Sequence, residues 1–228
     1  MHTQSGHDKR VRVAGIATYD EVIADRLDVS GVLTVDGDVR VERAKLSGAT
    51  TVQSDLRVDT MTVSGATNVD GDVTAADITV SGSLSATGTT AADAFECSGS
   101  VQLEHVKADG FEASGAVEAR TIQAGTVRIR GAIEAGRVEA DDVGFDLVSD
   151  SVVSRLVGDS VVVSRHRPDG FLRAEHVEGD RVALDHVDVG TVVGDHVRLG
   201  SDARVEVVRA DELDAADGAT VGTVERRE

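Results

Sequence analysis

The dipeptide Ser-Gly recurs at a strict interval in the first half of this chain. The pairs begin at Ser30, Ser47, Ser64, Ser81 and Ser98, so the same 17-residue interval separates each from the next. A fixed period of this length is typical of stacked structural repeats, in which each unit buries its apolar side against its neighbours. Aligned on this period, the segment 10–141 divides into eight repeats of a 17-residue or a 16-residue form, and the shorter form lacks one position in its second turn.

Apolar residues in each repeat form three pairs, at positions 2 and 4, 8 and 10, and 14 and 16 of the 17-residue form. A spacing of two places both side chains on one face of a β-strand. All of these positions are apolar except Thr50, Thr67 and Thr90, and the residues between the members of a pair are mostly polar. We therefore predict an all-β fold, a single-stranded parallel β-helix or solenoid. Three short strands per coil, separated by three turns, would close a triangle around an apolar interior.

Position 6 of every repeat is glycine. Two explanations remain open: a corner that needs a positive φ, or backbones stacked too closely for a Cβ atom. The glycines predicted to form this corner are Gly15, Gly31, Gly48, Gly65, Gly82, Gly99, Gly115 and Gly131.

The pattern loosens beyond Asp141. Val182, Val187, Val192 and Val197 follow one another at intervals of five residues, which indicates shorter faces. We predict an irregular continuation of the β-helix over residues 142–224, with a loop at 165–170 around the single proline of the chain. Residues 1–9 and 225–228 are expected to be disordered polar ends.

Composition agrees with a thin core and restricts the partners. The chain has no Trp, one Tyr and four Phe, whereas β-branched and small residues, which suit short strands, are abundant. Its 41 acidic and 23 basic residues give a net charge of -18, which argues against nucleic-acid binding. Excess acid with little Lys resembles the proteins of salt-loving archaea. Molar salt shortens the screening length to about 3 Å, so the carboxylates of such a surface would repel one another mainly in dilute buffer.

The location expected from these features is the cytoplasm. Cys97 is the only cysteine and cannot form an internal disulfide. No segment resembles a signal peptide, and no apolar stretch approaches the roughly 18 residues of a membrane span.

Four segments share an acid-His-Val pattern. They contain His105, His176, His186 and His196, each preceded by Glu or Asp and followed by Val. A ladder of such residues could bind a metal or sense pH. Their spacing does not follow the repeat, so we interpret them as solvated turn residues and predict no metal site.

Other reactive residues also have structural explanations. Cys97 occupies an inward position and is expected to be a buried, inert thiol. The repeated serines are turn residues, and no phosphate-binding loop is present, so we predict no catalytic residue and no cofactor. The basic cluster of Arg165, His166 and Arg167 is interpreted as a solvated loop; contact with an acidic partner or a lipid headgroup is the alternative.

The units Val-Ser-Gly and Val-Asp-Gly-Asp-Val in residues 29–39 and 63–73 resemble the bactofilins, which are polymer-forming cytoskeletal proteins, and their haloarchaeal relatives, the halofilins. The segments 194–200, 209–213 and 218–222 are similar too. The resemblance implies a right-handed helix, nucleotide-independent filaments and a role in cell shape. Association with the inner face of the membrane through another protein is a further expectation. The chain is expected to be solenoid over nearly its whole length, unlike the shorter cores of bactofilins. A regulator of a related polymer therefore stays open beside a filament former.

The ends of a β-solenoid are the expected assembly surfaces, because they expose unpaired strand edges and an open apolar interior. The candidate contacts are Val11, Val13, Ala17, Val221 and Val224. The partner would be a second copy or a paralogous β-helix protein, with no nucleic acid and no small-molecule substrate. A charge at Val13 or Val221 is predicted to block polymer growth and to leave the fold intact.

Two other functions are weighed against assembly. A hexapeptide-repeat acyltransferase has 18-residue coils with one large aliphatic side chain in six, and the paired inward residues seen here count against it. An acidic DNA mimic of the pentapeptide-repeat type agrees with the charge and with the five-residue faces after Val182, but its 20-residue coils do not fit residues 10–141.

Overall fold

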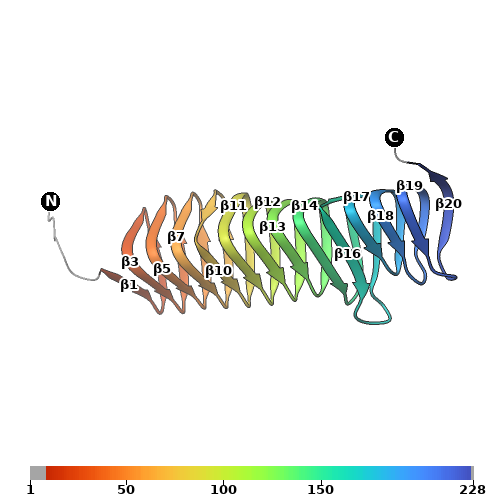
Figure 1. Cartoon of the computed structure of the whole chain (residues 1–228). Helices are drawn as coiled ribbons and strands as arrows, with labels where there is room; N and C mark the ends of the chain where they lie inside the picture. The colour runs from red at the N-terminus through yellow and green to blue at the C-terminus, as the bar shows by residue number, and fades with distance from the viewer. Residues whose placement is uncertain (1–8, 227–228) are drawn as a thin grey trace. The chain divides into compact units, whose positions relative to one another are not determined.

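The computed structural model describes residues 9–226, and all regular structure within that range is β-strand. Contacts between residues divide the chain into two compact units, which end and begin at His105 and Val106. Each unit is a β-solenoid of stacked coils whose neighbouring strands run parallel (Figure 1). The predicted fold class is therefore confirmed.

The first unit is built from strands of two to eight residues, followed by the 15-residue strand β11. Its strands are β1 (Arg10–Val13), β2 (Ile16–Tyr19), β3 (Val22–Val29), β4 (Val32–Val35), β5 (Val39–Leu46), β6 (Ala49–Val52), β7 (Leu56–Val63), β8 (Ala66–Val69), β9 (Val73–Thr74), β10 (Asp77–Val80) and β11 (Ser83–Cys97). Strand β12 (Ser100–Ala113) contains the point at which the two units meet in the sequence.

Register in the first unit follows the repeat. The first residue of each repeat pairs with the first residue of the next, so the strands that begin the coils stack directly on one another. This column runs through Arg10, Arg26, Arg43, Thr60, Asp77 and Ala94. A 16-residue step comes first and 17-residue steps follow, as the sequence alignment predicted.

Inward positions are buried as the pairs of apolar residues predicted. Leu27, Val29, Leu33 and Val35 of one coil are each at most 2% exposed. The three exceptions to apolarity are buried as well: Thr50, Thr67 and Thr90 are at most 2% exposed. In the first coil, the inward residues Val11, Ala17 and Tyr19 are partly exposed.

The corners differ from the predicted three turns. Strands β3, β5 and β7 run through the third corner without a break, and β11 continues through 15 residues of a 17-residue coil step. Two successive outward residues, such as Asp25 and Arg26, shift the alternation by one step and turn the chain while the backbone stays extended. These coils keep their three faces, but extended backbone joins two of the faces where the sequence predicted a separate turn.

The second unit contains the longer strands. They are β13 (Ala116–Ile129), β14 (Ala132–Leu147), β15 (Asp150–Val157), β16 (Ser160–Arg165), β17 (Phe171–Leu184), β18 (Val187–Leu199), β19 (Arg204–Ala215) and β20 (Thr220–Glu225). Its coils vary in length, because paired residues lie 16, 18, 21, 15 and 16 apart along the chain.

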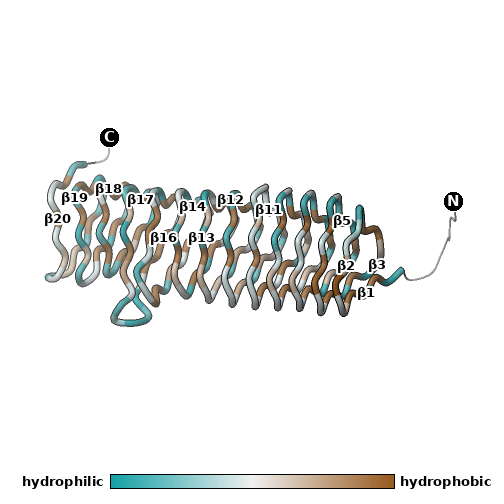
Figure 2. The backbone as a smooth tube through the Cα atoms, turned by 180° about the vertical axis from the view of Figure 1, so that it is seen from behind, coloured by the Kyte–Doolittle hydropathy of each residue, from teal (hydrophilic) through white to brown (hydrophobic). Residues whose placement is uncertain are grey.

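The 15-residue coil explains the valines spaced by five. Val182, Val187, Val192 and Val197 are all at most 2% exposed, and Val182 pairs directly with Val197. Three faces of five residues therefore close one turn of this unit. The 21-residue coil instead contains residues 166–170, which project between β16 and β17 as a hydrophilic loop (Figures 1 and 2).

The predicted disordered ends fall largely outside the described residues. Residues 1–8 and 227–228 are not described. Within the described range, the Lys9 amide donates a hydrogen bond to the Asp25 carboxylate, and Glu225 is the last residue of β20.

Candidate assembly surfaces

The N-terminal coil has one unpaired edge. Strand β1 pairs only with β3, and β2 pairs only with β4, among the described residues. The start of β3, Val22 to Ala24, likewise pairs on one side with β5. Amide and carbonyl groups on the other side of these three segments are therefore free to add a further strand.

Exposure rises at this edge. Val11 and Ala17 are half-buried, and Tyr19, whose repeat position is fully buried in later coils of the unit, is 39% exposed. Val13 is only 3% exposed, because the rest of its own coil and the next coil cover it. A charge at Val13 would thus disturb the fold as well as the edge. A Val13 variant therefore cannot distinguish a loss of assembly from a loss of stability, as the sequence had suggested it could.

Outward apolar side chains gather near the same end. Ile16 is 87% exposed, Ile23 52% and Val32 44%, and Ile16 pairs with Val32 across β2 and β4. Sequence reasoning missed these residues. For Ile16 and Val32 the available signal was the outward position after the glycine, which is Ile or Val in the first two repeats and Ala or Ser in the six that follow.

The C-terminal coil also ends on an unpaired edge. Strand β20 pairs only with β19, and the last segment of β19, Glu212 to Ala215, pairs only with β18, within the part of the chain that the structure describes. Val221 and Leu213 are half-buried, and Val224 is 59% exposed. Both ends that the sequence singled out therefore have incompletely covered inward side chains.

The repeated glycines are required by close backbone stacking. A Cβ atom at Gly31, Gly48, Gly65 or Gly82 would lie 1.9–2.0 Å from the carbonyl oxygen of the glycine in the preceding coil. None of these glycines has a positive φ. Of the two explanations, the structure thus supports the close approach. Gly99 and Gly131 are in the same situation, at 2.0 and 2.1 Å.

Gly15 is the exception in this column. A Cβ atom there would meet no described atom within 4 Å, because Gly15 belongs to the first coil and its bare side faces the open end. The first corner is therefore a flat surface on which the backbone of another coil could lie as closely as coils lie within the unit.

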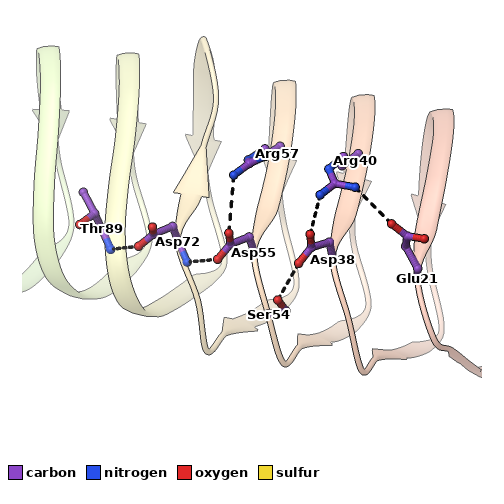
Figure 3. Close-up of polar contacts among 8 residues, drawn as sticks. All are labelled: Glu21, Asp38, Arg40, Ser54, Asp55, Arg57, Asp72 and Thr89. Carbon is purple, nitrogen blue, oxygen red and sulfur yellow. Dashed lines mark hydrogen bonds and ion pairs between the residues drawn. The ribbon is translucent and has the colours of Figure 1, made fainter.

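Polar side chains connect successive coils at the second corner of the first unit (Figure 3). The Asp55 and Asp72 carboxylates accept hydrogen bonds from the amides of Asp72 and Thr89, at 3.0 and 2.7 Å. The Ser54 hydroxyl donates to Asp38 at 2.6 Å. This hydrogen bond is the main reason that the pKa of the Asp38 carboxyl is lowered, with help from the Asp55 amide and the Arg40 and Arg57 charges. The corner is a structural ladder along the stack.

Two of the acid-His-Val histidines of the second unit contact different glutamates. In the second unit, His176 lies 3.2 Å from Glu178, and His196 lies 3.2 Å from Glu212 on a different strand. The hydrogen bond from His176 is the main cause that lowers the pKa of Glu178. His105 is exposed in the first unit. No group of three His, Cys, Asp or Glu side chains in the described residues is arranged to hold a metal ion.

His186 corrects the expectation that all four are solvated turn residues. It is only 8% exposed and occupies the corner between β17 and β18 with a φ of 55°, in the left-handed region. Its ring nitrogens lie 2.9 Å from Asp185 and 3.4 Å from Asp202. The corner has only two residues, Asp185 and His186, and the amide of His186 donates to the Ser201 carbonyl at 3.1 Å.

Cys97 and the basic cluster lie where the sequence placed them. Cys97 is 4% exposed, and burial raises the pKa of its thiol. Arg165, His166 and Arg167 are exposed at the start of the loop, and the His166 ring lies 3.1 Å from the Asp146 carboxylate. Asp146 of the same chain is therefore an acidic neighbour of this basic cluster.

Comparisons with known proteins give no relative: no family model, no curated protein and no solved structure matches the chain. Among the described residues there is no helix long and apolar enough to cross a membrane.

Proposed function

We propose that this protein is a structural protein of the cytoplasm that assembles end to end with other β-solenoids. It would form a polymer itself or regulate the assembly of a related one, contribute to cell shape, and use no nucleotide. In this proposal the chain is a bactofilin-like protein of the halofilin type, working in a salt-rich cytoplasm and reaching the inner face of the membrane through another protein.

The observation that carries the proposal is the first corner. Glycine at Gly31 to Gly99 is explained by the coil that precedes each of them, but no described coil precedes Gly15. A glycine at this position is useful if a coil of another molecule stacks on the N-terminal edge. The unpaired edges of β1, β2 and β20 and the exposed Tyr19 and Val224 support the same conclusion, because they expose strand edges and apolar surface that stacking would cover.

The direct test is assembly of the purified chain in molar potassium chloride and in dilute buffer, followed by light scattering and electron microscopy. We expect multimers or filaments in molar salt, where the negative surfaces are screened. A chain that stays monomeric in both solutions, and that also leaves a paralogous β-solenoid polymer unchanged on mixing, would contradict the proposal.

A variant pair locates the contact. Gly15→Leu places a bulky side chain on the N-terminal edge and should abolish assembly, with an unchanged thermal unfolding temperature because nothing described lies within 4 Å of the new Cβ. Ala14→Leu is the matched control, since Ala14 is an exposed neighbour in the same corner. Equal assembly of both variants and the wild type would exclude this edge as the contact. Val221→Glu is the corresponding change at the other end.

A further inference from the structure

The two ends of the chain carry complementary residues in matching strands. β1 exposes Arg10 and Arg12 on its outer side, with Val11 and Val13 directed inward. The last segment of β19 exposes Glu212 and Asp214, with Leu213 and Ala215 on the inward positions. Basic and apolar residues therefore alternate in β1, and acidic and apolar residues alternate in the last segment of β19.

These segments occupy the same place in the coil. The repeat alignment gives Val11 and Val127 the same position, the second of the repeat. In the second unit, register carries the Val127 column through Val143, Val161, Val182 and Val197 to Leu213. Leu213 is thus the residue on which the next Val11-like side chain would stack.

The other two faces match in the same way. The column of Ala119 ends at Val221, and the column of Ile122 ends at Val224. Their counterparts in the first repeat are Tyr19 and Val22. Among the described residues, β1 is the first strand of its coil, and β20 contains Val221 and Val224 of the second and third faces, so β1 of a following copy would take the place of the next strand.

From these columns we infer that copies of this chain associate head to tail, with β1 of one copy stacked in parallel on the β19 segment Glu212–Ala215 of the preceding copy. The inference rests on the proposed end-to-end assembly and specifies its partner and polarity. Arg10 stacks on Glu212, Val11 on Leu213, Arg12 on Asp214 and Val13 on Ala215.

Charge favours this polarity over the symmetric ones. Inside the second unit, the Arg198 guanidinium lies 3.1 Å from Asp214, and in the first unit Arg12 pairs in register with Asp28. Head-to-tail stacking continues one alternating column of Arg198, Asp214, Arg12 and Asp28. Placing β1 against β1 of another copy opposes arginine with arginine, and placing β19 against β19 opposes carboxylate with carboxylate, which is destabilising across neighbouring strands.

Cysteine cross-linking tests the arrangement. In a Cys97→Val background, Arg12→Cys and Asp214→Cys are prepared as separate full-length variants, one of them with a tag that shifts its mass. Stacked strands bring in-register Cα atoms to about 4.8 Å, within the range of a disulfide. A mild oxidant should give mixed dimers when the two variants are combined, and little dimer from either variant alone. Arg12→Cys combined with Asp188→Cys, an outward position on β18 away from the edge, is the control and should give none.

The outcomes separate this inference from the proposed assembly. Multimers of the wild type together with dimers of Arg12→Cys alone, or of Asp214→Cys alone, overturn the head-to-tail polarity and leave end-to-end assembly standing. A wild type that is monomeric in every salt, with no cross-link in any combination, overturns both. Mixed dimers alone support both.

Discussion

Three buried threonines, Thr50, Thr67 and Thr90, occupy inward positions of the first unit. Thr50 and Thr67 stack on each other in β6 and β8, and Thr90 lies further along β11. Their hydroxyl groups are buried and have no hydrogen-bond partner. A buried hydroxyl without a partner carries the desolvation cost of the group and no compensating bond. These residues therefore lower the stability of the first unit relative to valine.

Thr67→Val is accordingly expected to stabilise the protein. The two side chains have the same shape, so the change removes only the unsatisfied hydroxyl, and the free energy of unfolding should rise by about 1 kcal/mol. Urea unfolding followed by circular dichroism measures it. Thr51→Val, on the outward side of β6, is the control and should change stability by less than about 0.5 kcal/mol. A lower stability of Thr67→Val would mean that the hydroxyl has a partner after all.

At the scale of the structural element, the corner glycines limit how closely coils stack. A Cβ atom at Gly65 would lie 2.0 Å from the Gly48 carbonyl oxygen, and the atom met is backbone, which cannot rotate away. Gly65→Ala should therefore separate two coils locally and lower the free energy of unfolding by about 3 kcal/mol. Chemical denaturation measures the loss.

Gly144 provides the matched comparison for this prediction. It lies within β14, and a Cβ atom there meets nothing within 4 Å. Gly144→Ala should be neutral or stabilising by about 0.5 kcal/mol, because alanine restricts the unfolded chain more than glycine does. If both variants lower the free energy of unfolding equally, the flexibility of glycine, and not the close stacking of coils, would explain why glycine is needed at Gly65.

Local repetition determines how much of the fold the sequence can predict. The inward pairs, the buried threonines and the corner glycines recur at fixed positions, so the alignment of repeats alone is enough to place them. The corner at His186 could not be found in this way. Left-handed backbone occurs there and again at Asp202 in the next coil, outside the regular repeats and in coils of unequal length. The continuous strands at the third corner were not predicted for a related reason. Two successive outward residues interrupt the alternation of inward and outward positions, and in the sequence this interruption looks like a turn.

The candidate surfaces were predictable only in part. Open ends follow from any uncapped solenoid, and the sequence identified Val11, Val221 and Val224 on that basis. Which strand of the last coil faces which strand of the first depends on the 18-, 21- and 15-residue coils, whose lengths no regular period supplies. The match between Arg12 and Asp214 therefore became visible only through the observed register.

At the scale of the whole molecule, net charge opposes folding in dilute solution and would also oppose the proposed assembly. The net charge of -18 is distributed over a chain of 228 residues. Ion pairs such as Arg198–Asp214 and Arg209–Glu225 are exposed, and exposed pairs contribute at most about 1 kcal/mol each. The unpaired acidic surplus consequently dominates the salt response.

Added salt should therefore stabilise the chain. The screening length falls from about 10 Å at 0.1 M to 3 Å at 1 M, so repulsion between carboxylates on neighbouring coils is largely removed while the short ion pairs lose little. We expect the thermal unfolding temperature, measured by circular dichroism, to rise steadily from dilute buffer to molar potassium chloride. Sucrose at matched osmolality is the control, because it stabilises by exclusion and does not screen charge. An unfolding temperature that sucrose raises as much as the salt does would attribute the effect to exclusion and not to the acidic surface.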